Sequence, residues 1–141
     1  MIKKLYNIFL LLLLFIVHHN VEANLTISPV KLKFKAGEEV RTLIVKNSGN
    51  YISSFQLGVY SIEYVKGQEV YKATKDLLAT PLMFTTMPNQ SQSIRIVVLN
   101  KDIYSNQKKR YVMKITEVPI LLSKQGADIK FLMQYIIPIY I

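Results

Sequence analysis

The sequence predicts an all-β protein, a single sandwich of about seven strands. From residue 25 onward the apolar residues alternate with a period of about two, as in a strand, rather than about 3.6, as in a helix. Clusters of turn-forming residues recur at intervals of roughly 8–15 residues, and no segment carries a convincing helical pattern. A length of 141 residues is enough for one domain and no more.

The first half of the chain contains three predicted strands. Residues 25–34 form the first, and because Pro29 has no amide hydrogen, this strand should lie at an edge or change its partner there. Residues 40–46 form the second strand and end in an Asn- and Gly-rich turn signal. Residues 52–65 form the third, and residues 66–68 then reverse the chain as in a hairpin.

The second half contains four predicted strands, separated by turns and by one long polar connection. These strands are expected at residues 82–86, 93–99, 110–118 and 128–141. The whole pattern indicates an immunoglobulin-like β-sandwich. The chain contains neither Cys nor Trp, so the inter-sheet disulfide and the buried Trp of antibody domains are excluded.

The start of the chain has the order of a secretory signal peptide. Two early lysines supply a positive start, residues 8–17 are uninterruptedly apolar, and Val21 and Ala23 place small residues at a cleavage site. The apolar run is well short of the roughly 20 residues that cross a bilayer. We therefore expect residues 1–23 to be removed, leaving a mature domain of residues 24–141 without a transmembrane segment.

Residue usage excludes most kinds of catalytic site. Both histidines, His18 and His19, lie in the signal segment and the chain has no Cys, so the mature domain lacks imidazole and thiol groups. Ser–His and Cys–His nucleophile pairs and zinc sites with these ligands are therefore excluded. The adjacent carboxylates Glu38 and Glu39 follow Gly37 in a turn, where solvation explains them. We expect a protein that is not an enzyme and uses no metal or other cofactor.

The chain is basic, with a net charge of +9, which favours acidic partners. The basic residues do not form one stripe: Lys31, Lys33 and Lys35 alternate in one stretch, residues 108–110 form another cluster, and the rest are scattered. Solvated strand faces and turns explain most of them. Because the chain is expected to be exported, nucleic acid is not an expected partner.

The last predicted strand, residues 128–141, is apolar on both faces. One register is apolar throughout, and after Asp128 the other is broken only by Lys130 and Gln134. An antiparallel edge strand of this kind promotes aggregation unless a partner covers it. Two interpretations are open. The strand is enclosed by its own domain, between neighbours or beneath a loop, or its outer side binds another protein by strand addition.

Four segments follow one another in a recognisable order. They are Ile27-Ser28-Pro29-Val30-Lys31 through Gly37, residues 43–50, residues 76–84 together with Ser93-Ile94-Arg95-Ile96, and Thr116-Glu117-Val118-Pro119. In this order they resemble the N-terminal domain of periplasmic pilus (fimbrial) chaperones, and most of all the archaic-type branch. The likeness covers nearly all of the mature chain.

The resemblance implies a mechanism. In this family the pilus subunit is a sandwich that lacks its last strand, and the chaperone inserts its own last strand until the subunit is polymerised at an outer-membrane usher. Here Ile129, Phe131, Met133 and Tyr135 would be the donor side chains. The implied partners are pilus subunits and an usher, in the periplasm of a Gram-negative bacterium.

The resemblance also implies a cationic anchor for the terminal carboxylate of the subunit. Lys31 matches the member of the family's basic pair on the opening strand, whereas the second member falls near the uncharged Pro138. Arg95 is the candidate replacement. Family members carry a second sandwich domain of similar size, and this sequence stops where the first domain would end.

Other functions remain open at this stage. The chain would also fit a truncated or orphan sandwich without chaperone activity. It would equally fit a basic module of the cell envelope that binds polyanions through Lys31, Lys33, Lys35 and residues 108–110. Self-association through the last strand is a further expectation.

Overall fold

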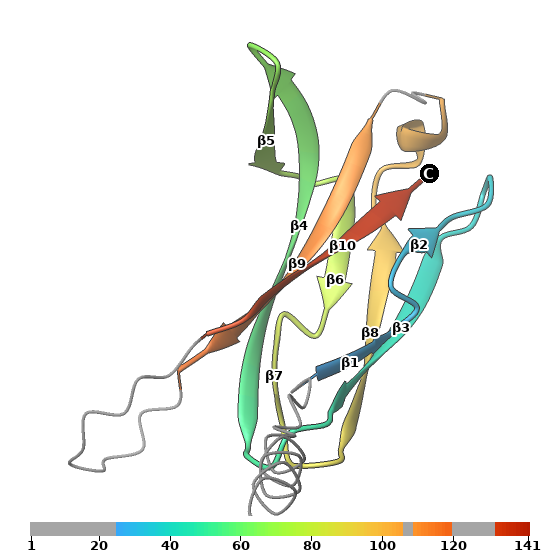
Figure 1. Cartoon of the computed structure of the whole chain (residues 1–141). Coiled ribbons are helices and arrows are strands. Elements are labelled where there is room, and N and C mark those ends of the chain that lie inside the picture. Colours follow the sequence, from blue (N-terminus) through green and yellow to red (C-terminus); the bar gives the residue numbers. More distant parts are fainter. Residues whose placement is uncertain (1–24, 106–108, 120–131) are drawn as a thin grey trace, which may run out of the picture.

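The computed structural model describes residues 25–105, 109–119 and 132–141. Over these ranges the chain forms two β-sheets packed face to face, with one short 3-10 turn, η1 (Lys101–Tyr104), before β9 (Figure 1). The expected all-β, immunoglobulin-like sandwich is confirmed. Within the same ranges, no helix has the length and apolar character needed to cross a membrane.

The two sheets differ in size. The first has four strands in the order β1-β3-β8-β6. Their bounds are Leu25–Ser28 for β1, Val40–Asn47 for β3, Leu77–Thr80 for β6 and Ser91–Val98 for β8. The second has the order β2-β10-β9-β4-β5, and β7 also pairs with β4. Their bounds are Leu32–Lys33 for β2, Ser53–Val65 for β4, Gln68–Ala73 for β5, Met83–Thr86 for β7, Arg110–Val118 for β9 and Gln134–Tyr140 for β10.

The first predicted strand changes sheets around Pro29, as its missing amide hydrogen led us to expect. Before this residue, β1 pairs antiparallel with β3. After it, β2 pairs parallel with β10 in the other sheet, Leu32 with Ile139 and Lys33 with Tyr140. The crossing therefore brings the opening strand beside the C-terminal end of β10 (Figure 1).

Two strands that the sequence pattern did not predict, β5 and β6, complete the sheets. The β5 strand pairs with β4 beyond the hairpin, but its side chains are mostly exposed and show no alternation of burial. The β6 strand is four residues long and pairs with one half of β8. The chain then passes Pro81 and joins the other sheet as β7, which pairs with β4.

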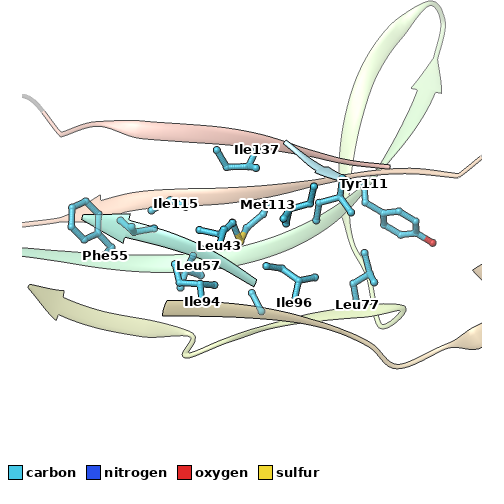
Figure 2. Packing of buried hydrophobic residues seen from close by; sticks show 14 of the residues in the cluster. Leu43, Phe55, Leu57, Leu77, Ile94, Ile96, Tyr111, Met113, Ile115 and Ile137 are labelled. Atoms are coloured by element: carbon cyan, nitrogen blue, oxygen red, sulfur yellow. The ribbon is translucent and has the colours of Figure 1, made fainter. Parts of the chain in front are cut away.

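The hydrophobic core lies between the sheets and is built from alternate residues of the central strands. The residues labelled in Figure 2 are Leu43, Phe55, Leu57, Leu77, Ile94, Ile96, Tyr111, Met113, Ile115 and Ile137. In β10, Ile137 and Ile139 are only 4% and 2% exposed and belong to this core. The C-terminal half of the last strand is thus enclosed by its own domain.

Asp76 ties one end of the sandwich together. Its carboxylate accepts hydrogen bonds from Tyr111 Oη (2.7 Å), Asn100 Nδ2 (2.9 Å) and Lys109 Nζ (3.1 Å). These bonds, led by that of Tyr111, lower the pKa of Asp76 from 3.8 to about 2. The backbone carbonyl of Asp76 accepts the amide of Leu99 at 2.8 Å, so the residue just before β6 is fixed beside the end of β8.

Candidate functional site

The backbone of β10 faces two different neighbours. The amide of Glu117 in β9 donates to the carbonyl of Met133 at 2.9 Å, whereas the amide of Phe34, just after β2, donates to the carbonyl of Tyr140 at 2.9 Å. Backbone groups alternate in direction along an antiparallel strand. Odd-numbered residues of β10 therefore bond to β9, and even-numbered residues face the opposite side.

That opposite side is open over the N-terminal half of β10. The β2 strand pairs with β10 only at Ile139 and Tyr140. Gln134 and Ile136 lie before this contact, and no strand of the described chain pairs with their outward backbone groups. Pro138 also points this way, so its missing amide hydrogen does not weaken the ladder with β9. The edge can therefore accept an extended segment by strand addition.

The inward-facing side chains of β10 become more exposed toward the start of the strand. Ile139 and Ile137 are buried, Tyr135 is half-buried, and Met133 is 45% exposed. The inward-facing side chains of β10 thus leave the core toward the start of the strand. This is the same half of β10 that has the open backbone edge. Two of the predicted donor side chains lie outside the described residues: Ile129 and Phe131.

The outer face of the same sheet carries a fixed cation. Lys114 of β9 lies opposite Ile136 of β10, and its Nζ is 4.4 Å from the ring centroid of Tyr71 and 5.2 Å from that of Tyr60. Gly58 pairs with Lys114 on the β4 side, and a Cβ there would lie 2.7 Å from Tyr60 Oη. Glycine therefore gives the Tyr60 ring room to lie back along its own strand, on the side where Lys114 is held.

Lys114 is a residue that the sequence interpretation missed. The usable signal is alternation, because Met113 and Ile115 point into the core and Lys114 must then point outward. Its aromatic partners come from β4 and β5, however, and β5 was not predicted. The cation and Tyr60 were on predicted strands, but the strand that carries Tyr71 was not predicted.

The two predicted carboxylate anchors lie on different sheets. Lys31 is exposed and comes one residue before Leu32, which pairs with Ile139 at the end of β10. Arg95 is exposed on β8, where its neighbours across the strands are Thr42 and Thr80. Only Lys31 is therefore next to the candidate donor strand. In the described residues, no group of His, Cys, Asp or Glu is arranged to hold a metal ion.

The fold and the edge of β10 together define a class of protein: an immunoglobulin-like sandwich whose terminal strand keeps one side of its backbone open. The chain belongs to the family of pili and flagellar-assembly chaperones, PapD N-terminal domain, which matches residues 24–141. The resemblance drawn from the sequence is confirmed. The family is one of assembly chaperones and not of enzymes.

Solved structures with the same fold include chaperones from several bacteria. A structure of the CsuC–CsuE chaperone–tip adhesion subunit pre-assembly complex from the archaic Csu pili of Acinetobacter baumannii matches 84% of this chain and 56% of that chain, with 16% identity and a TM-score of 0.67. The E. coli chaperone DraB matches 83% of this chain and 53% of its own, with 19% identity and a TM-score of 0.65.

A third structure holds the Salmonella enterica SafA pilin in complex with the SafB chaperone. It matches 82% of this chain and 52% of that chain, with 20% identity and a TM-score of 0.64. At such identities the likeness establishes the fold. The chain spans about half the length of the structures it matches. Comparison with curated protein sequences gives no significant match.

Proposed function

We propose that the protein is a periplasmic chaperone that binds a pilus subunit by lending it the N-terminal half of β10. One observation carries the proposal: the backbone edge at Gln134 and Ile136 is open where Met133 emerges from the core. A subunit that lacks a strand would pair with this edge, and apolar side chains of β10 would fill its groove.

The exposure of these side chains fits a complex that must later dissociate. Met133 and Ile136 are each 45% exposed, so about half of each side chain is available for burial against a client. Full burial of such a side chain contributes about 1.5–3 kcal/mol, and the exposed half therefore about 1 kcal/mol. Several contacts of this size hold a subunit without making its release prohibitively slow.

We further propose that Lys31 anchors a carboxylate of the client. It lies beside the end of β10, and Lys114 offers a second cation on the same sheet, opposite Ile136. Lys114 is thus a candidate substitute for the charge that the resemblance expects near Pro138. Arg95 would contact the same client only if that client also reached the outer face of β8.

A basic envelope-binding module is the weaker alternative. Its second proposed cluster is largely engaged within the fold, because Lys109 Nζ lies 3.1 Å from Asp76 Oδ2 and Arg110 pairs with Glu69. Lys108 lies outside the described residues. Polyanion binding would fall steeply with added salt, whereas strand addition through apolar contacts would not.

Site-specific photo-cross-linking in the periplasm tests the proposed function. A photoreactive residue placed at Met133 or Gln134 should cross-link to a pilus subunit, because both positions border the open edge. The same residue at Thr42, exposed on the other sheet, is the matched control and should give no such product. Equal yields at Thr42 and Met133, or no subunit among the products from Met133, would reject strand lending.

A further inference from the structure

We propose that Glu117 is a positioning residue that ends the β9–β10 ladder at Met133 and so fixes where the donor part of the chain begins. This inference rests on the proposed function. Glu117 occupies a register of β9 whose other members, Tyr111, Met113 and Ile115, point into the core. The side chain of Glu117 therefore belongs to the inward face of the strand, where an apolar residue is usual.

A carboxylate in this place needs hydrogen-bond donors. Glu117 is only 8% exposed, and a buried charge without partners is strongly unfavourable. The amide of Met133 donates to Glu117 Oε2 at 3.4 Å. Burial, and after it the charge of Glu117, raises the pKa of Tyr135, which places the carboxylate near this side chain as well.

The pairing of Glu117 with Met133 departs from a regular ladder. In a regular hydrogen-bonded pair of antiparallel strands, the two residues exchange both of their backbone bonds. Here the amide of Glu117 donates to the Met133 carbonyl, but the amide of Met133 donates to the Glu117 side chain instead. The backbone ladder therefore changes to a side-chain contact at Met133, one residue before β10 begins.

This change has a consequence for where the ladder ends. Because the Met133 amide bonds to the side chain of Glu117, it does not bond to the Glu117 carbonyl as the next step of the ladder. Glu117 would thus make Tyr135, opposite Ile115, the last residue of β10 that pairs with β9 through both of its backbone groups. Met133 keeps one such bond and lies at the start of the part presented to a client.

Amide hydrogen exchange, measured by NMR on the free protein, tests this role without a client. In Glu117→Ala the Met133 amide should exchange about tenfold faster, the loss expected for one hydrogen bond. The amides of Ile137 and Ile139, which bond to β9, should stay within about twofold of wild type. Glu117→Gln keeps an oxygen acceptor and should restore slow exchange, while the weaker neutral acceptor moves the Met133 amide proton upfield.

Thr116→Val is the matched control on the same strand. It removes the 3.1 Å bond from Gln134 Nε2 to Thr116 Oγ1 but leaves Glu117 in place, so exchange at Met133 should not change. The positioning role is wrong if Met133 is unaffected in Glu117→Ala, if Gln fails to restore it, or if Ile137 and Ile139 accelerate equally. The last result would mean that Glu117 only stabilises the fold.

Cross-linking separates this inference from the proposed function. With Glu117→Ala, the yield of cross-links from Met133 should fall relative to the yield from Gln134, because the Met133 amide is no longer held. If the wild-type protein gives no cross-links at all, the lending of β10 is disproved while the exchange result still decides the role of Glu117. If the ratio of the two yields does not change, Glu117 does not position Met133 for the client.

Discussion

The backbone edges of β10 and β8 are each open over part of their length, and they are built differently. In β8 the amide of Val98 donates to Glu39 and the carbonyl of Gln90 accepts from Asn47, so even-numbered residues face β3 and odd-numbered residues face β6. The β6 strand pairs with β8 only from residue 95 to residue 98. Ser91 and Ser93 therefore have outward backbone groups that no described strand pairs with, as Gln134 and Ile136 do in β10.

The side chains decide what each edge can do. The open part of β8 carries the exposed Ser91 and Ser93, and the side-chain amide of Gln92 donates to the Ser93 carbonyl at 2.8 Å. Polar residues and local capping of this kind discourage pairing with another chain. The open part of β10 has Met133 and Ile136, apolar and half-exposed. The comparison teaches that an open ladder alone does not make a docking edge, because the protein protects one edge and leaves the other apolar.

The largest expected effect comes from breaking the attachment of β10 to its own core. Ile139→Ala removes a side chain that is 2% exposed and should lower the free energy of unfolding by about 3 kcal/mol. Ile136→Ala, on the open half of the same strand, should lower it by less than about 1 kcal/mol. Urea unfolding of both variants measures the difference. Equal losses would mean that the two halves of β10 are not distinct.

A smaller effect on stability is expected from Asp76, which lies just before β6, the strand that covers the other half of β8. The pKa of Asp76 is about 2, below its ordinary value of 3.8, so the folded state binds this proton less tightly than the unfolded chain. The stabilisation is therefore fully present above about pH 4 and is lost as the pH falls through 2. A shift of this size corresponds to about 2 kcal/mol.

Asp76→Asn should accordingly lower the free energy of unfolding by about 2 kcal/mol at pH 7 and by much less at pH 2. Urea unfolding of the variant and the wild type across this pH range measures the gap. Because the residue holds the start of β6 beside β8, the amide of Leu99 should also exchange faster in the variant. A gap that does not depend on pH would show that the Asp76 charge is not what fixes β6.

The alternation of apolar residues was enough to predict the sandwich, and Pro29 was enough to predict an edge position or a change of partner, because both are local properties of the chain. The unusual character of β10 was also visible as an apolar pattern on both faces. Which half of β10 is enclosed was not visible. That depends on Leu32 pairing with Ile139, a contact between residues far apart in the sequence.

The candidate site was less accessible from the sequence for the same reason. Glu117 belonged to a recognised segment, but nothing local indicates that its carboxylate lies on the inward face and accepts the Met133 amide. Lys31 was found through the resemblance and lies beside β10, whereas Arg95 lies on the other sheet. The donor roles of Ile129 and Phe131 remain predictions, since these residues lie outside the described part of the chain. The same holds for the signal peptide.

Making the edge of β10 resemble that of β8 should weaken client capture with little change in stability. Ile136→Thr keeps a β-branched side chain but removes apolar surface that a client would cover. We expect capture of a pilus subunit to fall about tenfold, the equivalent of about 1 kcal/mol. Co-purification from the periplasm measures it, with Ile44→Thr, a similar substitution on the outer face of β3, as the control. The docking edge lies elsewhere if both variants lose capture equally.

The converse change, making β8 resemble β10, should have the smallest effect. Gln92→Ala with Ser93→Ile removes the cap on the Ser93 carbonyl and adds an apolar side chain at the open edge. We expect unfolding free energy to change by less than about 0.5 kcal/mol, as for most surface substitutions. Copies carrying a net charge of +9 repel one another, so any association through the new edge should appear only at high protein concentration and rise with salt.

Light scattering over a range of concentration and salt measures this association, with Gln92→Ala alone as the control for the cap. If the double variant associates and the single variant does not, the serine side chain at residue 93 is what prevents copies of the protein from associating through β8. If neither associates, the shortness of the open β8 segment is its main protection, because β6 already covers the rest of the strand. The difference between the two edges would then lie in their length as much as in their side chains.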